Sequence, residues 1–249
     1  MADAIPVQSR ASGVAPHRGP LGRLLGWVLS IAVWLVLGLF GNILFECVCV
    51  GLLWPDQGPR RSQAMLEAEL AYLGNDIKAS LLVEHPTDFA TGMAADLHRR
   101  LYVDTGLTSL LRRAETAASR IEENPFFRQR LDDTLVGLRK YLAAAMIATQ
   151  VYAVRVAVLV LAMPVFCLFG LVALVDGIVS RDLRRFGVGR EHGQVYHLAK
   201  RAIGPTLTLP WAIYLAWPTT VHPNYVILPF ALLFAVAVAV SAATFKKYL

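Results

Sequence analysis

The sequence predicts an all-α membrane protein with four transmembrane helices and a small helical periplasmic domain between the first and the second. Of its 249 residues, 56% are hydrophobic and only 17% are charged, whereas soluble domains carry about a quarter charged residues. The charged residues are missing from long apolar runs that alternate with ordinary polar stretches, as spans alternate with loops. Basic residues gather in every second loop, which also predicts an orientation.

The first transmembrane helix is expected over residues 24–54. It follows a tail, residues 1–23, that is rich in Ala, Pro, Ser and Gly and is predicted to be disordered. The apolar run is longer than the about 7–15 residues of a secretory signal. Trp27 and Trp54 flank it, as aromatic residues often do at membrane interfaces. We therefore expect a retained span.

Residues 55–140 form the predicted helical periplasmic domain. Their charges nearly cancel, with 12 Lys and Arg against 13 Asp and Glu, and apolar residues recur at helical spacing. Thr87 or Asp88 is expected to cap its second helix, and Asn124 followed by Pro125 marks the start of its last helix. The apolar stripe of that last helix continues into the next apolar run, so we expect the helix to enter the membrane.

The rest of the chain supplies the other spans. The run 141–179 is too long for one perpendicular span, so part of it should stand outside the bilayer or tilt. Arg155 makes residues 156–179 the embedded part, and Pro164 is a candidate kink. The predicted segments are a helix entering the membrane together with the second span (141–179), a basic cytoplasmic loop (180–202), the third span (203–217), a periplasmic turn (218–224), the fourth span (225–245) and a cytoplasmic tail (246–249).

The orientation follows from the charges, because short loops rich in Lys and Arg stay in the cytoplasm. Residues 1–23, 180–202 and 246–249 carry net charges of +2, +4 and +2, whereas 55–140 carries −1 and 218–224 carries none. This alternation predicts a multi-pass protein of the bacterial inner membrane with both termini in the cytoplasm.

Two ionisable residues inside the predicted spans are candidates for a pair. Glu46 lies about 10 Å from the outer end of the first span by helix rise, and Arg155 lies at a comparable depth in the second. An ionisable group within a span is a functional candidate by default. We expect Glu46 and Arg155 to pair and lock the two helices together. The alternative is that each side chain reaches the interface separately.

The 180–202 segment carries the densest set of charged and aromatic side chains. It has three alternative uses besides simple topology signalling: holding anionic lipid headgroups at about 1 kcal/mol for each basic residue, docking an acidic cytoplasmic partner, or contacting nucleic acid phosphates without reading sequence. The candidate contact residues are Arg181, Asp182, Arg184, Arg185, Arg190, Glu191, Tyr196, His197, Lys200 and Arg201.

Small residues in the fourth predicted span indicate close helix packing. Ala231, Ala235 and Ala239 repeat every four residues, a spacing that lets helices approach closely. Packing within the helix bundle is the expected use, and a contact between subunits is the alternative.

The sequence carries no enzyme signature. It has no Walker loop, no His-Glu-x-x-His and no Gly-x-Ser-x-Gly motif. Its three cysteines, Cys47, Cys49 and Cys167, lie in apolar runs, where unactivated thiols usually serve packing. We predict no catalytic residue, no metal site and no cofactor.

Several short motifs carry a family resemblance. They are Val175-Asp176-Gly177, Arg181-Asp182-Leu183-Arg184-Arg185-Phe186-Gly187, Gly189-Arg190-Glu191, Tyr196-His197, Ala199-Lys200-Arg201, Pro210-Trp211, His222-Pro223-Asn224 and Phe245-Lys246-Lys247-Tyr248-Leu249. In these motifs the chain resembles the integrating-conjugative-element membrane proteins, a bacterial family with a domain of unknown function. The resemblance covers almost the whole chain and is most specific from about residue 175 onward. It implies a gene in a conjugative transfer cluster, near type IV secretion genes and the coupling ATPase, and it assigns no catalytic residues.

The expected function is therefore that of an inner-membrane accessory or scaffold component of a conjugative type IV secretion system. Its partners would be membrane lipids and other conjugation or secretion proteins, with the coupling ATPase as one candidate. The first alternative is an entry-exclusion protein, which acts in the recipient rather than the donor. The second is a small transporter or membrane enzyme, for which the spans offer only Glu46, Arg155 and Asp176 as polar groups.

Overall fold

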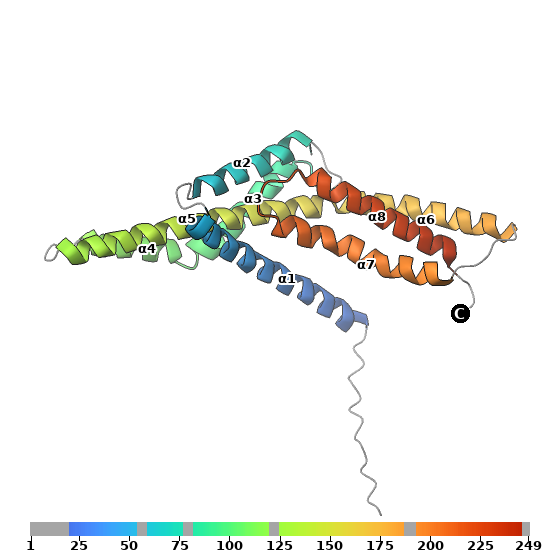
Figure 1. Ribbon diagram of the computed structural model, residues 1–249, viewed down its shortest axis with the longest axis horizontal. Helices are drawn as coiled ribbons and strands as arrows, with labels where there is room; N and C mark the ends of the chain where they lie inside the picture. Colours follow the sequence, from blue (N-terminus) through green and yellow to red (C-terminus); the bar gives the residue numbers. More distant parts are fainter. Residues whose placement is uncertain (1–19, 54–58, 77–81, 120–124, 187–192, 246–249) are drawn as a thin grey trace, which may run out of the picture. The chain divides into compact units, whose positions relative to one another are not determined.

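The computed structural model describes residues 20–53, 59–76, 82–119, 125–186 and 193–245, and nearly all of them are helical (Figure 1). This confirms the all-α class. The elements are α1 (Pro20–Val48), the π-helical turn η1 (Cys49–Leu53), α2 (Pro59–Asp76), α3 (Pro86–His98), the π-helical turn η2 (Arg99–Val103), α4 (Leu107–Ser119), α5 (Pro125–Leu161), α6 (Met163–Phe186), α7 (Gly193–Ala216) and α8 (Pro223–Thr244).

The chain forms two compact units, residues 1–37 and residues 38–249. Within the first unit the structure describes the beginning of α1. Its apolar side chains are largely exposed, as at Leu25 (70%) and Trp34 (72%). A helix with apolar side chains around its whole circumference suits a hydrocarbon environment.

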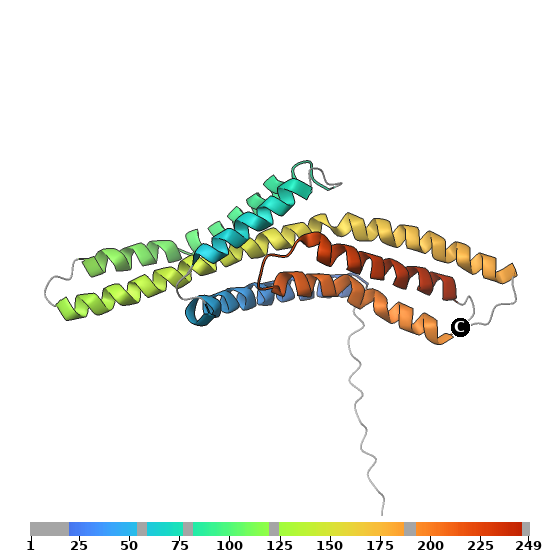
Figure 2. The same ribbon diagram turned by 45° about the horizontal axis from the view of Figure 1, so that its top comes forward.

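In the second unit, α8 packs against both α6 and α7, and the three helices lie side by side (Figures 1 and 2). The contact with α6 is close at Gly177, where an added Cβ atom would lie 2.6 Å from the carbonyl oxygen of Ala239 and 2.7 Å from Cβ of Ala242. Of the other predicted packing alanines, Ala231 is fully buried and Ala235 is half-buried. Small residues of α8 therefore make direct contacts within this bundle.

The helices α2, α3 and α4 pack against α5. Three of these helices share a core, which joins Leu73 of α2, Ala90 of α3, and Val154 and Val158 of α5, all of them fully buried. The helical domain predicted over 55–140 is therefore organised around a longer helix, because α5 continues to Leu161 and supplies much of this core.

A break at Ala162 separates α5 from α6. Pro164 has no N–H to donate to the carbonyl of Val160, so an unbroken helix would lose a hydrogen bond there. In the structure Pro164 instead lies in the first turn of α6, where no donor is needed, and the Val165 N–H donates to Ala162 O at 3.0 Å. The interruption predicted from Pro164 is thus present as a helix boundary.

Two tyrosines of α5 reach the end of α1 and the turn η1 at two glycines. A Cβ atom added to Gly38 would lie 2.7 Å from the Tyr152 hydroxyl, and one added to Gly51 would lie 2.9 Å from the Tyr141 hydroxyl. Because the residue number rises along α1 as it falls along α5, the two helices are antiparallel over this stretch.

Among the described residues, three helical segments are long and apolar enough to cross a membrane: Val28–Leu53, Asp133–Leu183 and Pro223–Thr244. The predicted third span lies in α7, which is not one of the three; this helix carries Lys200 and Arg201 together with two internal prolines. The second segment has 51 residues, or roughly 77 Å of helix, so it is far longer than the hydrocarbon core of about 30 Å.

Candidate functional site: a buried ion pair between the helical domain and the bundle

The site begins with Glu69 on the buried face of α2. Ser62, Leu66, Glu69 and Leu73 fall three or four residues apart, so they share one side of the helix. Glu69 and Leu73 are both fully buried. A carboxylate on a face that is otherwise in contact with protein needs charged or hydrogen-bonding partners, because an unpaired buried charge is strongly unfavourable.

Arg155 of α5 supplies the charge that Glu69 needs. Its Nε and Nη2 atoms donate to Oε1 of Glu69 at 3.0 and 2.8 Å, and the two side chains are 1% and 0% exposed. On α5, the neighbouring Val154, and Val158 about one turn further on, are fully buried as well. The ion pair therefore lies inside the protein, where ions are weakly screened by solvent.

Tyr214 of α7 donates a further hydrogen bond to the carboxylate of Glu69. Its hydroxyl donates to Oε2 of Glu69 at 2.7 Å, and its ring lies 5.4 Å from the guanidinium carbon of Arg155. Each carboxylate oxygen of Glu69 thus accepts at least one hydrogen bond. Burying a charge pair is tolerable only when such additional hydrogen bonds are present.

The remaining donors of Arg155 reach the segment between α7 and α8. Nη1 donates to the carbonyl of Trp217 at 2.6 Å, and Nη2 also donates to the carbonyl of Thr219 at 2.7 Å. Carbonyl groups just beyond a helix C-terminus lack helical partners and favour a positive charge. One side chain therefore ties α5 to α2 and to the end of α7.

Further contacts hold α2 against the same segment. Arg61 donates to the carbonyl of Pro218 at 3.2 Å, and the rings of Tyr72 and His222 lie 5.0 Å apart. His222 also caps α8, because its Nδ1 accepts from the N–H of Asn224. The helical domain is thus attached to the turn between α7 and α8 along most of α2.

A second buried polar contact lies nearer the start of α5 than Arg155 does. The hydroxyl of Tyr102 in η2 is 3.1 Å from the carbonyl of Ala145 and 2.8 Å from Oγ1 of Thr149. Burial raises the pKa of the Tyr102 phenol above its usual value, so the hydroxyl keeps its proton and its ability to donate. This contact fastens the end of α3 and η2 to α5.

The structure corrects the pairing predicted for Glu46. Arg155 takes Glu69 as its partner, and Glu46, which is also buried, accepts a hydrogen bond from Ser62 of α2 at 2.5 Å. The physical reason is that α1 meets α5 between Tyr141 and Tyr152, so Glu46 lies beside a different part of α5 from the part that carries Arg155.

Glu69 was not among the predicted site residues, because it looks like one of many surface charges in a near-neutral segment. Its position offered a signal. It lies three residues after Leu66 and four before Leu73, on the same apolar stripe. An acidic residue on an apolar stripe indicates a buried partner somewhere else in the chain.

Much of the segment predicted as a basic loop is helical. Arg181 and Asp182 lie in α6, with Nη2 of Arg181 3.5 Å from Oδ1 of Asp182, and Arg184 and Arg185 follow in the same helix. Arg190 and Glu191 lie outside the described residues.

The other candidates of this segment lie in the first turns of α7: Tyr196, His197, Lys200 and Arg201. The Tyr196 ring meets the rings of His197 and Phe245 at 5.4 and 6.0 Å, and Nζ of Lys200 lies 5.8 Å from its centre. These contacts link the start of α7 to the end of α8.

The cluster of Glu69, Arg155 and Tyr214 serves to hold helices together. All three nitrogens of Arg155 donate to acceptors of the chain itself, and both carboxylate oxygens of Glu69 accept hydrogen bonds from Arg155 or Tyr214. Such a cluster leaves little capacity for a substrate. Elsewhere in the described part of the chain there is no group of three His, Cys, Asp or Glu side chains that could hold a metal ion.

Comparison with known proteins gives one match. A family model described as "IncC plasmid conjugative DNA transfer protein DtrJ-like" matches residues 53–246, which is most of the chain. Neither the curated proteins nor the solved structures give a match. The predicted link with conjugation is confirmed, whereas the family description names a plasmid and no integrating element.

Proposed function

The chain belongs to the DtrJ-like family of IncC plasmid conjugative DNA transfer proteins, and we propose that it is a scaffold component of the transfer machinery, anchored in the bacterial inner membrane. The observation that carries this proposal is the fully buried pair of Glu69 and Arg155. It fixes a helical domain against the end of an apolar helix bundle. Such a protein holds its helical domain at a fixed position on the membrane anchor. A fixed position suits a scaffold that other proteins bind.

The proposed topology has four spans: α1, the α6 part of the long apolar segment, α7 and α8. The 15 residues of α7 that follow Arg201 (202–216) reach about 22 Å, a short span that local thinning of the bilayer and snorkelling basic residues can accommodate. The helix α7 also packs on α8, which is apolar enough to span. Its two basic residues, Lys200 and Arg201, fall at the cytoplasmic end in this arrangement, where such residues favour retention.

Contacts of α2 support the same topology. Arg61 and Tyr72 of α2 touch Pro218 and His222 of the turn between α7 and α8, so the helical domain and this turn share one side of the membrane. Both are poor in net positive charge. The positive-inside rule therefore assigns both to the periplasm, and both termini to the cytoplasm.

This arrangement places Arg155 at the outer boundary of the bilayer rather than within it, because its guanidinium is level with the carbonyls of Trp217 and Thr219. Glu46 then lies in the periplasmic part, since the antiparallel packing of α1 on α5 carries residues after Gly38 away from Arg155. Both ionisable groups thus avoid the cost of a charge in hydrocarbon.

The surfaces offered to partners are the periplasmic domain and the cytoplasmic basic segment. Apolar side chains remain exposed on the domain, at Leu110 of α4 (57%) and at Val136 and Leu138 of α5 (68% and 53%). Exposed apolar groups outside the bilayer favour a protein contact. We propose other conjugation or secretion proteins as partners, with the coupling ATPase as the cytoplasmic candidate, and neither catalysis nor sequence-specific nucleic acid binding.

The test of this role is a mating assay in which the gene is deleted either in the donor or in the recipient. A scaffold predicts that transfer falls only when the donor lacks the protein, and that wild-type expression in the donor restores it. If expression in the recipient alone lowers uptake, the protein acts in entry exclusion. Unchanged transfer in every combination refutes a role in the machinery.

A photocrosslinking experiment locates the partner surface. A photoreactive amino acid at Val136 should capture another transfer protein in mating-competent cells, because that position is exposed on the domain. Leu168, which is 59% exposed on α6, is the matched control, since in the proposed topology it faces lipid. Protein adducts at Leu168 but none at Val136 would contradict the proposed surface.

A further inference from the structure

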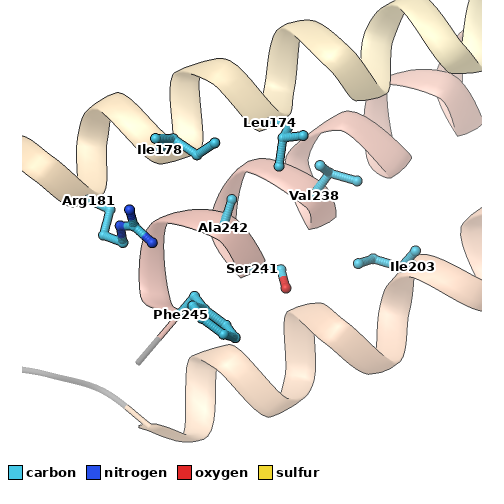
Figure 3. Close-up of a pocket in the computed structure, with 8 residues that line it drawn as sticks. All are labelled: Leu174, Ile178, Arg181, Ile203, Val238, Ser241, Ala242 and Phe245. Atoms are coloured by element: carbon cyan, nitrogen blue, oxygen red, sulfur yellow. The ribbon is translucent and has the colours of Figure 1, made fainter. Parts of the chain in front are cut away.

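A cavity of about 340 Å³ opens between α6, α7 and α8 at the end of the bundle opposite the Glu69 cluster. Its walls are apolar and include Leu174 and Ile178 of α6, Ile203 of α7 and Val238 of α8. Figure 3 shows Arg181 at one end of this apolar space and Ser241 beside it. The cavity therefore combines apolar walls with one cationic side chain, that of Arg181.

Arg181 has unused capacity to donate hydrogen bonds. Its Nε is buried and has no hydrogen-bond partner, while Nη2 lies 3.5 Å from the Asp182 carboxylate. A buried N–H without an acceptor is unfavourable, and native structures contain few of them. An arginine fork suits a phosphate group in particular, because two parallel N–H groups can bind two of its oxygens.

We propose that this cavity binds an anionic phospholipid, with one acyl chain between α6, α7 and α8 and the phosphate on Arg181. The apolar walls match a hydrocarbon chain and exclude a free phosphate as the whole ligand. Lys200 of α7 adds positive charge nearby, because its Nζ lies 5.8 Å from the centre of the Tyr196 ring, which meets the cavity-lining Phe245. Basic pockets between spans on the cytoplasmic side are suited to anionic headgroups. The proposal extends the membrane placement above and is independent of any role in transfer.

Aromatic contacts fix the helices around this site. The ring of Tyr196 in α7 meets the ring of Phe245, which lines the cavity, at 6.0 Å. This contact holds the start of α7 against the end of α8, so the distance between these helices is set by protein contacts. The cavity is therefore a partly open groove with this contact at its rim.

The proposal is tested on the purified full-length protein by native mass spectrometry, with equal amounts of phosphatidylglycerol and phosphatidylcholine of the same acyl length. The wild type should retain phosphatidylglycerol preferentially. Arg181→Gln should reduce this preference about fivefold, whereas Arg201→Gln, which removes an exposed charge outside the cavity lining, should leave most of it. Equal losses in both variants would overturn the site in favour of diffuse surface charge.

A second variant tests the acyl chain separately from the charge. Ser241→Leu keeps Arg181 but fills part of the cavity, so it should reduce the amount of retained lipid of either headgroup.

Arg181→Lys keeps the charge without the fork and should retain an intermediate preference for phosphatidylglycerol, which also guards against a folding defect in Arg181→Gln. Glycerol 3-phosphate, which has no acyl chain, should not displace the lipid. Displacement by it, or unchanged retention in Ser241→Leu, would overturn the proposal.

Discussion

Arg155 donates two hydrogen bonds to a single oxygen of Glu69, and both side chains are almost completely enclosed by protein. The two residues are 86 positions apart, on α5 and α2. The same guanidinium also holds two carbonyls after α7. This pair therefore contributes directly to the attachment of the helical domain to the bundle.

Arg155→Met should lower the free energy of unfolding by about 3–5 kcal/mol, because it leaves the Glu69 carboxylate buried without its positive partner. Thermal unfolding in mild detergent measures this loss. Arg139→Met is the matched control, since its pair with Glu115 is 4.0 Å long and its side chain is 74% exposed; it should unfold almost as the wild type does. Similar losses in both variants would contradict a special role for Arg155.

Glu69→Gln should destabilise the protein more than Glu46→Gln. The first change leaves the guanidinium of Arg155 buried without a counter-charge, whereas Glu46 has a neutral partner, the Ser62 hydroxyl. Removing one member of a buried ion pair is costlier than weakening a hydrogen bond. Unfolding temperatures of the two variants give the comparison. The opposite order would favour a pair between Glu46 and Arg155.

Gly177→Ala should destabilise the bundle by about 1–3 kcal/mol, because the new methyl group must push α6 away from Ala239 and Ala242. Gly204→Ala in α7 is its control, since an added Cβ there meets no atom within 4 Å. That change should be neutral or slightly stabilising, as alanine is the better helix former. Unfolding in detergent distinguishes the two variants, and a harmless Gly177→Ala would show that the two helices are farther apart.

Cysteine labelling in intact cells should place Arg100→Cys and Lys200→Cys on opposite sides of the membrane. Both positions are exposed in the structure, and the three native cysteines are first replaced by alanine. A membrane-impermeant maleimide should label position 100 from the periplasm, and position 200 only after the cells are opened. Labelling of both positions from outside would refute the four-span topology.

The sequence predicted the local structure well because helix signals are local. Pro125 starts α5 and Gly106, with a φ angle of 76°, precedes α4, both in agreement with helix-boundary chemistry. The cap of α3 was predicted wrongly. The helix begins at Pro86 after His85, which makes no side-chain cap hydrogen bond, so the fixed φ of proline is enough to start it.

The candidate site could not be predicted in the same way, because its members meet only in the folded chain. Arg155 was identified as a candidate because it lies in an apolar run. Its partner was chosen only because the two residues lie at similar depths in the predicted spans. That criterion selected Glu46, whereas the packing of α2 on α5 brings in Glu69. Tyr214 and the carbonyls of Trp217 and Thr219 carry no signal of pairing in the sequence.

The wide separation of Glu69 from its partners has a consequence for biogenesis. Tyr214 is synthesised 145 residues after Glu69, so α2 leaves the ribosome long before the last two helices exist. The charged partner of Glu69, Arg155, follows 86 residues later, and the Tyr214 hydroxyl is added only once α7 has been made. A truncated chain that ends before α7 would thus lack the Tyr214 hydroxyl and the carbonyls of Trp217 and Thr219, and its Glu69–Arg155 pair would be incomplete.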